Sequence, residues 1–283
     1  MSNPSIRIAV FGSTGAGKTS FINQATGANL KVGNGAASST KKVQRVEVSS
    51  DKVGGRKVIL IDTPGFNDTD LEEPRLFLHI ANWLANSLHN GECLNGAIFL
   101  QGINAVRVLK GEENGVKLFE TIVGTKAFSQ VVVATTMWDQ VERDFGVRNE
   151  ENRARVWDNL KTGRAKFYRF YNTEDSALEI VRACLDFPEI KFLLQEELIA
   201  HNGRVKKTSA AQFFKNNLDM KVKDVRAQVR ISGSTNKLRE TVKRLRSWLR
   251  ELITSTIRLG ASAWGPVTAV GAIVRVWVWE IQS

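Results

Sequence analysis

Cysteine is scarce in this chain. Only two of the 283 residues are cysteine, Cys93 and Cys184, and they lie far apart. This number and spacing exclude a disulfide framework and a cysteine metal site, and they are typical of a reducing compartment. The first thirty residues also lack the apolar core of a signal peptide. The sequence therefore predicts a cytoplasmic protein.

Long apolar runs are missing as well. Residues 259–274 carry no charge, but this stretch of sixteen residues is shorter than the roughly 20 apolar residues of a membrane span. It ends at Arg275 and is followed by Val276-Trp277-Val278-Trp279, whose tryptophans suit a bilayer interface. We favour attachment of this tail to the cytosolic face of a membrane over its burial on the protein or in an oligomer. The alternation in residues 274–279 also allows a strand.

Acidic residues are scarce in one segment. Residues 203–258 hold 15 Lys and Arg against 4 Asp and Glu, whereas residues 1–202 hold 24 of each sign. Such an asymmetry indicates an anionic partner for residues 203–258, either a lipid surface or a nucleic acid. The aromatic residues of the segment are Phe213, Phe214 and Trp248, without a base-stacking pattern. We therefore expect an anionic membrane surface, bound through residues 237–283, rather than a nucleic acid.

One motif near the start of the chain organises the rest. Residues Gly12-Ser13-Thr14-Gly15-Ala16-Gly17-Lys18-Thr19 fit the pattern G-x-x-x-x-G-K-[ST], and an apolar run, 6–11, precedes them. The glycines let backbone N–H groups turn toward a di- or triphosphate, and the dipole of the following helix favours the same charge. Lys18 supplies a positive charge to the β- and γ-phosphates, and the Thr19 hydroxyl reaches Mg²⁺.

Two further stretches are candidates for the magnesium site. The apolar run 57–61 ends in Asp62-Thr63-Pro64-Gly65. In P-loop proteins, a strand that ends in D-x-x-G places the Asp in the magnesium shell and the Gly N–H near the γ-phosphate. In the connector 26–43, which has no clear period, Thr40 is our candidate for ligating magnesium and sensing the γ-phosphate. We assign catalytic roles to Lys18 and Thr40.

The glutamine that orients water in Ras-like proteins is absent. No Gln occurs between Gln44 and Gln101, and Phe66 follows the D-x-x-G motif. The group that orients the attacking water is therefore missing or comes from elsewhere.

A third stretch is placed to read the base. Thr136-Met137-Trp138-Asp139 ends the run 130–136 and matches the position of the motif [NT]-K-x-D. The Asp139 carboxylate can accept hydrogen bonds from guanine N1–H and the 2-amino group, which adenine lacks. Met137 replaces the Lys that packs on the base, although a polarisable Met can also lie on a purine face. Asn172, in the loop after the run 165–170, is a second candidate for contact with the base.

The order of apolar runs and helical patterns predicts an α/β fold, a P-loop NTPase three-layer sandwich with a mostly parallel sheet. The pattern predicts strands at 6–11, 43–48, 57–61, 96–100, 130–136 and 165–170, and helices at 71–88, 112–123 and 176–185. We expect three parts: a GTP-binding domain (1–202), a basic helical extension (203–258) and an apolar tail (259–283).

The basic extension has a helical pattern of its own. Leu238, Val242, Leu245, Leu249 and Leu252 follow heptad spacing, with basic residues on the other faces. Residues 232–236 separate this helix from an earlier basic helix at about 210–229. The pattern is consistent with a helix packed on the domain, a coiled-coil arm or a helix on a membrane surface.

Taken together, these motifs resemble one family. The loop motif extended by Ser20, the sequence Asp62-Thr63-Pro64-Gly65-Phe66 and a Thr-x-x-Asp strand end followed by an Asn loop resemble the immunity-associated and chloroplast-import-receptor GTPases, kin to septins. The resemblance covers roughly residues 5–200. Residues 135–139, 172–173 with 176–177, and 195–198 are most similar to fungal G-domain proteins of that group.

The resemblance implies a switch that binds GTP or GDP with Mg²⁺ and turns over slowly. It also implies dimerisation across the nucleotide face and a membrane-attaching C-terminal extension. The alternative is a membrane-associated assembly scaffold that nucleotide binding regulates, with little hydrolysis.

Overall fold

The computed structural model describes residues 5–31, 43–65, 73–105, 110–232 and 236–259. In this part of the chain the strands form one six-stranded sheet, in the order β2-β3-β1-β4-β5-β6. β2 runs antiparallel to β3, and the other neighbours are parallel. The prediction of an α/β fold with a mostly parallel sheet is confirmed. The strands are β1 (Ile6–Gly12), β2 (Gln44–Val48), β3 (Val58–Asp62), β4 (Gly96–Gly102), β5 (Val131–Thr136) and β6 (Lys166–Arg169).

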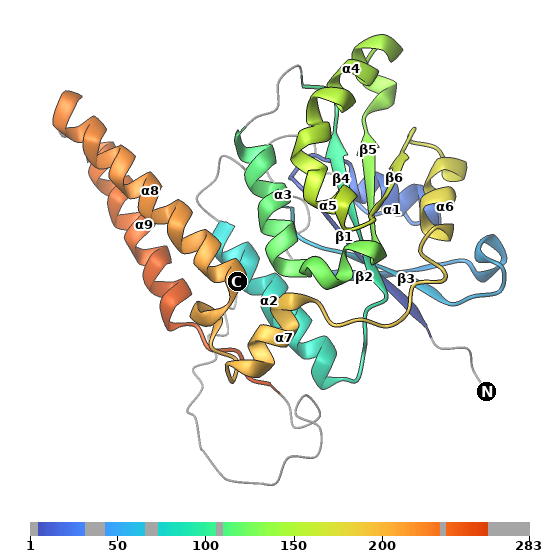
Figure 1. Ribbon diagram of the computed structural model, residues 1–283, viewed down its shortest axis with the longest axis horizontal. Coiled ribbons are helices and arrows are strands. Elements are labelled where there is room, and N and C mark those ends of the chain that lie inside the picture. Colours follow the sequence, from blue (N-terminus) through green and yellow to red (C-terminus); the bar gives the residue numbers. More distant parts are fainter. Residues whose placement is uncertain (1–4, 32–42, 66–72, 106–109, 233–235, 260–283) are drawn as a thin grey trace, which may run out of the picture.

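Helices cover both faces of the sheet (Figure 1), which is why the central strands read as continuous apolar runs. Side chains alternate between the two faces of a strand. In β1, Ala9 and Phe11 therefore join the core on one face, and Ile8 and Val10 join the core on the other. The helices are α1 (Lys18–Thr26), α2 (Glu73–His89), α3 (Lys110–Val123), α4 (Arg143–Arg153), α5 (Asp158–Thr162), α6 (Glu174–Arg182), α7 (Leu193–Ala200), α8 (Ser209–Ser232) and α9 (Asn236–Thr254).

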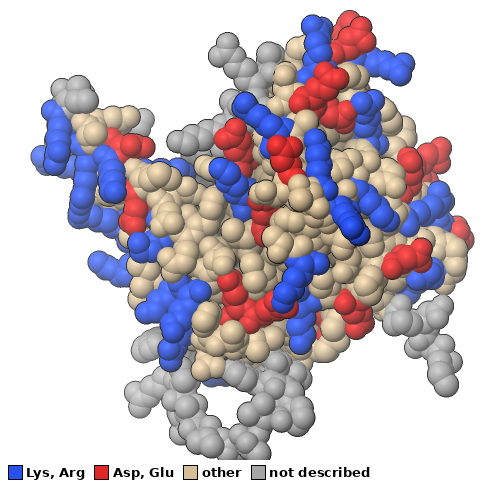
Figure 2. Space-filling model, in the orientation of Figure 1, with Lys and Arg blue, Asp and Glu red and all other residues tan. Residues whose placement is uncertain are grey.

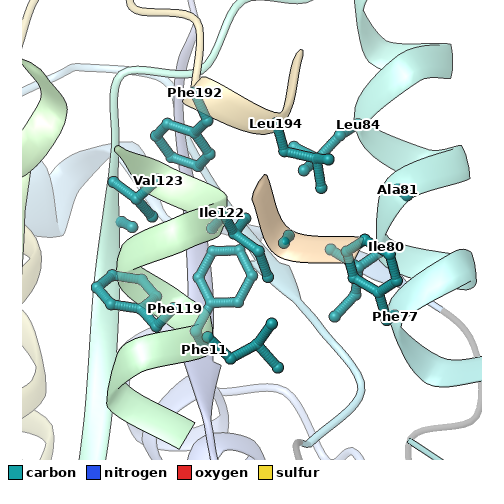
Figure 3. Packing of buried hydrophobic residues seen from close by; sticks show 14 of the residues in the cluster. Phe11, Phe77, Ile80, Ala81, Leu84, Phe119, Ile122, Val123, Phe192 and Leu194 are labelled. Carbon is teal, nitrogen blue, oxygen red and sulfur yellow. The ribbon is translucent and has the colours of Figure 1, made fainter. Parts of the chain in front are cut away.

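The larger core lies between the sheet and the helices α2, α3 and α7 (Figure 3). Phe11 of β1 meets Phe119 of α3 with ring centroids 5.4 Å apart, and Phe192, just before α7, closes the same cluster. The smaller core lies under α1 and α6. The two cores hold β1, β3, β4 and β5 rigid, and these are the strands whose ends carry the predicted site.

The basic extension forms a helical hairpin, α8 and α9, that projects from the domain (Figure 1). Leu218 and Val222 of α8 pack on Leu245 and Trp248 of α9, so part of the predicted heptad seam is covered within the chain itself. At the base of the hairpin, Phe214 lies 4.9 Å from Phe77 of α2, centroid to centroid. The base therefore belongs to the core of the domain, while Lys and Arg side chains predominate among the charged residues toward the far end on the face that Figure 2 shows.

Several predictions fall outside the described residues. Thr40, Phe66 and the tail 260–283 are among them, so the predicted roles of Thr40 and of the tail stay predictions. In the described ranges, no helix combines the length and the apolar character that crossing a bilayer requires. The sequence patterns did not indicate α4, α5 and α7, which complete the layer on the α3 face.

Candidate nucleotide-binding site

The predicted site residues meet at the carboxyl ends of the parallel strands, where open α/β sheets bind ligands. β1 leads into the loop 12–17, β3 ends at Asp62, and β5 ends at Thr136. Asn172 follows β6, two strands away from β4. Four stretches that are separated in sequence therefore share one edge of the sheet.

The loop between β1 and α1 has the backbone of a phosphate cradle. Gly15 and Gly17 have φ angles of 80° and 84°, which favour glycine, and Gly17 caps the start of α1. A Cβ on Gly12 would lie 2.4 Å from the Leu100 carbonyl oxygen, so β1 can approach β4 this closely only with glycine. The Ala16 N–H donates to the Ser13 carbonyl at 3.1 Å and closes the turn. Thr19 and Ser20 follow in the first turn of α1, partly exposed.

Lys18 lies across this loop. Its Nζ donates to the carbonyl oxygens of Gly12 and Ser13 at 3.0 and 2.9 Å. Burial lowers the pKa of Lys18 to about 8, and the charge of Asp62 opposes that shift. The ammonium is therefore largely protonated at pH 7 and buried, and among the described residues its hydrogen bonds go to neutral carbonyl oxygens. Such a group favours a bound anion.

The segment Asp62–Gly65 packs directly against the loop. The Thr63 hydroxyl donates to the Val10 carbonyl at 2.7 Å and fixes this turn to β1. A Cβ on Gly65 would lie 2.7 Å from Lys18 Nζ and 2.8 Å from Thr14 N, so residue 65 must be glycine for this approach. Gly65 is thus adjacent to Lys18, as the D-x-x-G motif predicts for a residue that contacts the terminal phosphate.

The side chains in the loop and the turn suit a magnesium ion bound with phosphate. Thr19 offers a hydroxyl and Asp62, 1 % exposed, offers a carboxylate, which are the hard oxygen donors that Mg²⁺ prefers. Within the described ranges no group of three or more His, Cys, Asp or Glu side chains could hold a metal by itself. The donor set fits an ion that keeps water and phosphate oxygens in its shell.

The end of β5 connects the loop to the predicted base site. The Thr136 hydroxyl donates to the Ala16 carbonyl at 3.0 Å, which joins β5 to the phosphate loop. Met137 and Asn172 have φ angles of 68° and 59°, in the left-handed region. Asn172 Nδ2 donates to Asp139 Oδ2 at 3.2 Å, and both side chains are exposed. The structure thus brings together the two residues predicted to contact the base.

Sequence reasoning did not identify two groups beside the site. Arg153 and Glu112 form a buried ion pair that holds the loop after β4, with the Arg153 Nη2 donating to the Ala105 carbonyl at 3.0 Å. Arg169 lies 4.4 Å from the centroid of the Trp138 ring, next to Asp139. Both contacts join residues from different elements, so no local sequence pattern predicts them.

Comparison with known proteins bears on the loop and the fold. Residues 7–95 match the model of a family described as 50S ribosome-binding GTPase. That range contains the phosphate loop and the Asp62–Gly65 turn. The fold is that of a P-loop GTPase.

Solved structures of similar fold include Toc33 from Arabidopsis thaliana. The complex with Mg²⁺ and GMPPNP is 16% identical with a TM-score of 0.50, covering 65% of this chain and 85% of Toc33. The complex with GDP and Mg²⁺ is 16% identical with a TM-score of 0.51, covering 66% and 88%. A third structure comes from a study of how dimerization affects the GTPase activity of atToc33 and psToc159. It is 16% identical with a TM-score of 0.51, covering 65% of this chain and 83% of that chain. At this identity the likeness shows the fold alone. No curated protein matches the chain in sequence.

Proposed function

We propose that this protein is a nucleotide-dependent switch that binds GTP and GDP with Mg²⁺ and hydrolyses GTP slowly. The observation that carries the proposal is the position of Lys18, whose buried ammonium lies over the loop carbonyls and beside Gly65. The match of residues 7–95 to a GTPase family model supports the same conclusion, and Toc33 structures of the same fold hold Mg²⁺ with GMPPNP or GDP.

Each site residue has one role in this proposal. The amides of residues 13–20 and the Lys18 ammonium bind the phosphates. Thr19, Asp62 and Thr40 hold Mg²⁺, which would neutralise phosphate charge, and the Gly65 N–H contacts the γ-phosphate. Thr136 fixes the base loop to the phosphate loop, and Asp139 accepts from guanine with Asn172 beside it.

We propose slow hydrolysis because the sequence near Gly65 lacks a glutamine of the kind that orients water in Ras-like proteins. The proposal gives Lys18 and Thr40 the catalytic roles of stabilising charge and sensing the γ-phosphate. The segment 45–100 contains no Gln that could orient water. The nucleotide state, rather than rapid turnover, would then be the output of the protein.

A competition experiment tests this function. Purified protein is expected to bind fluorescent GTP in the presence of Mg²⁺, with displacement by unlabelled GDP and GTP at similar concentrations. ATP should displace it only at concentrations at least about a hundredfold higher, because adenine lacks both donors for Asp139. Equal displacement by ATP would contradict the guanine assignment, and absence of any binding would contradict the function itself.

We include dimerisation across the nucleotide face in the proposal. The chloroplast proteins atToc33 and psToc159 support it, because dimerization is important for the GTPase activity of those proteins. Sedimentation with GMPPNP and with GDP provides the readout, and a larger dimer fraction with GMPPNP is the expected result. An unchanged sedimentation profile would remove dimerisation from the switch.

A second candidate function is a membrane-associated assembly scaffold. The basic hairpin favours it, because Arg244, Arg246 and Arg250 of α9 are exposed, and Lys and Arg side chains gather on the hairpin (Figure 2). Anionic lipid headgroups attract such a surface with about 1 kcal/mol for each basic residue. A cytoplasmic location, the attachment of the tail and the kinship with fungal or immunity-associated proteins stay predictions.

Flotation with liposomes tests the scaffold function on the full chain. Wild-type protein is expected to float with vesicles that contain phosphatidylserine and not with neutral vesicles. Replacing Arg244, Arg246 and Arg250 together by Gln should reduce flotation at least about tenfold. The matched control replaces Arg143, Arg148 and Arg155, three exposed arginines of the domain, and should float normally. Equal flotation of both triple variants would exclude the hairpin as the membrane contact.

A further inference from the structure

We propose that Arg169 and Glu150 are positioning residues for recognition of the base, acting through Trp138 on the backbone that presents Asp139. The inference rests on the proposed guanine-nucleotide binding and deepens it, because it names residues that set specificity without touching the nucleotide.

Four side chains form a closed ring of contacts beside the base site. The Arg169 guanidinium lies 4.4 Å from the centroid of the Trp138 ring. Arg169 also donates to Glu150, with Nε–Oε2 at 3.0 Å and Nη2–Oε2 at 2.5 Å. Glu150 Oε1 accepts from the Thr135 hydroxyl at 2.8 Å, and that hydroxyl accepts from Trp138 Nε1 at 3.0 Å. The ring therefore holds both the face and the N–H edge of the indole.

Three of these residues come from three different elements that surround the base loop, and the fourth belongs to that loop. Thr135 is the next-to-last residue of β5, Glu150 lies on α4, and Arg169 ends β6, while Trp138 belongs to the loop itself. The helix α4 also presses on the indole, because a Cβ on Gly146 would lie 2.8 Å from Trp138 Cζ3. Trp138 is 8 % exposed. These contacts together fix the position of the indole.

The next residue along the chain is the one that needs this support. Asp139 is exposed, and within the described part of the chain its side chain accepts a single hydrogen bond, from Asn172 at 3.2 Å. Two parallel hydrogen bonds to guanine require the carboxylate to be held within about 0.5 Å of its productive position. The anchored Trp138 supplies this constraint through the backbone, in a turn where Met137 is already in the left-handed region.

Arg169 acts through the indole and not on the ligand. Its hydrogen bonds go to Glu150 and Tyr171, and the pair lines a groove together with Trp157 and Tyr168. Removal of Arg169 should therefore leave phosphate binding intact and impair only the part of the affinity that comes from Asp139.

Titrations with GDP, IDP and ADP separate these two contributions. IDP lacks the 2-amino group of guanine and so loses one of the two hydrogen bonds to Asp139. Wild-type protein is expected to bind GDP at least about tenfold more tightly than IDP. In Arg169→Ala and in Glu150→Gln this ratio should fall at least about fivefold, with IDP affinity changed less than about threefold. Arg148→Ala and Glu151→Gln, on exposed positions of α4, are the matched controls and should keep the wild-type ratio.

The remaining outcomes each count against the proposal. An unchanged GDP-to-IDP ratio in both ring variants overturns it and leaves the guanine assignment intact. Equal weakening of GDP and IDP overturns it too, because that result indicates a merely structural role. If wild-type protein binds ADP as tightly as GDP, the proposed guanine-nucleotide binding is wrong, and the inference that rests on it is wrong with it. Should Arg169→Ala not fold, Trp138→Phe keeps an aromatic ring and loses only the N–H bond to Thr135, and its ratio is then expected to fall.

Discussion

Lys18→Ala is expected to weaken the binding of GTP by about a hundredfold or more and that of GDP by about tenfold or more. Hydrogen bonds to charged groups contribute about 1.5–3 kcal/mol each, and the Lys18 ammonium has donors for both the β- and γ-phosphates. Losing both in GTP corresponds to about 3–6 kcal/mol, or a factor of roughly 10² to 10⁴ in Kd, and losing the β-phosphate bond in GDP corresponds to about 1.5–3 kcal/mol, or roughly tenfold to a hundredfold. Titrations of fluorescent GDP and fluorescent GMPPNP, followed by anisotropy, measure the two changes.

The same variant should remain folded. Lys18 is 7 % exposed, and burial of its charge already opposes protonation, since its pKa is lowered to about 8. Removing the ammonium relieves that desolvation and offsets the loss of its two hydrogen bonds to the loop carbonyls. Lys126→Ala, at an exposed lysine that pairs with Glu196, is the matched control and should bind GDP normally. Binding by Lys18→Ala within about threefold of wild type would refute the assigned role of the loop.

The parts of the site that could be predicted are those whose geometry is local in the sequence. The loop 12–19 lies directly between the end of a strand and the start of a helix, so the motif itself determines the shape of the turn. Asp62 and Asp139 lie far from it in the chain, but each ends a buried apolar run. Because parallel strands end at one edge of a sheet, that order alone places them near the loop.

The contacts that could not be predicted join polar residues across long separations. Arg153 and Glu112 are 41 residues apart, and each lies in a charged stretch that resembles a solvated surface. Apolar residues are few in α4, so no period of the sequence indicates which face it buries. The Trp138–Arg169 contact likewise depends on where β6 lies next to β5, which only the sheet order reveals.

In the hairpin, too, an apolar sequence pattern predicts a helix but not the residues that pack against it. The heptad spacing of residues 238–252 predicts a helix with one apolar seam, and α9 is that helix. The pattern does not state what covers the seam. In the structure Leu218 and Val222 of α8 contribute to the cover, so the charged faces of both helices are left to solvent or to a partner.

Arg153→Met is expected to destabilise the protein by about 3–5 kcal/mol at neutral pH, because it leaves the Glu112 carboxylate in a buried position without its partner. Arg153 is 1 % exposed and meets Glu112 through two bonds, Nε–Oε2 and Nη2–Oε1, both 3.0 Å. Its other donors go to the carbonyls of Asn149 and Ala105 at 3.0 Å. Urea denaturation followed by circular dichroism gives the free energy of unfolding.

The loss should depend on pH. Burial raises the pKa of Glu112, and the bonds and charge of Arg153 oppose that rise. Without Arg153 the pKa of Glu112 rises further, so the folded state binds a proton that the unfolded state has released. In that window the stability of the variant falls as pH rises. The difference from wild type is therefore expected to shrink between pH 7.5 and pH 5.5.

Two comparisons decide whether the buried pair is responsible. Glu112→Leu combined with Arg153→Met removes both charges, and we expect it to cost about 2 kcal/mol or less. The neighbouring pair Arg155 and Glu113 joins the same two regions of the chain at 3.6 Å with the arginine side chain 73 % exposed, and its removal should cost about 1 kcal/mol or less. An equal effect at both pairs, or a loss at Arg153 that does not change with pH, would show that packing rather than the stranded carboxylate determines the stability of this loop.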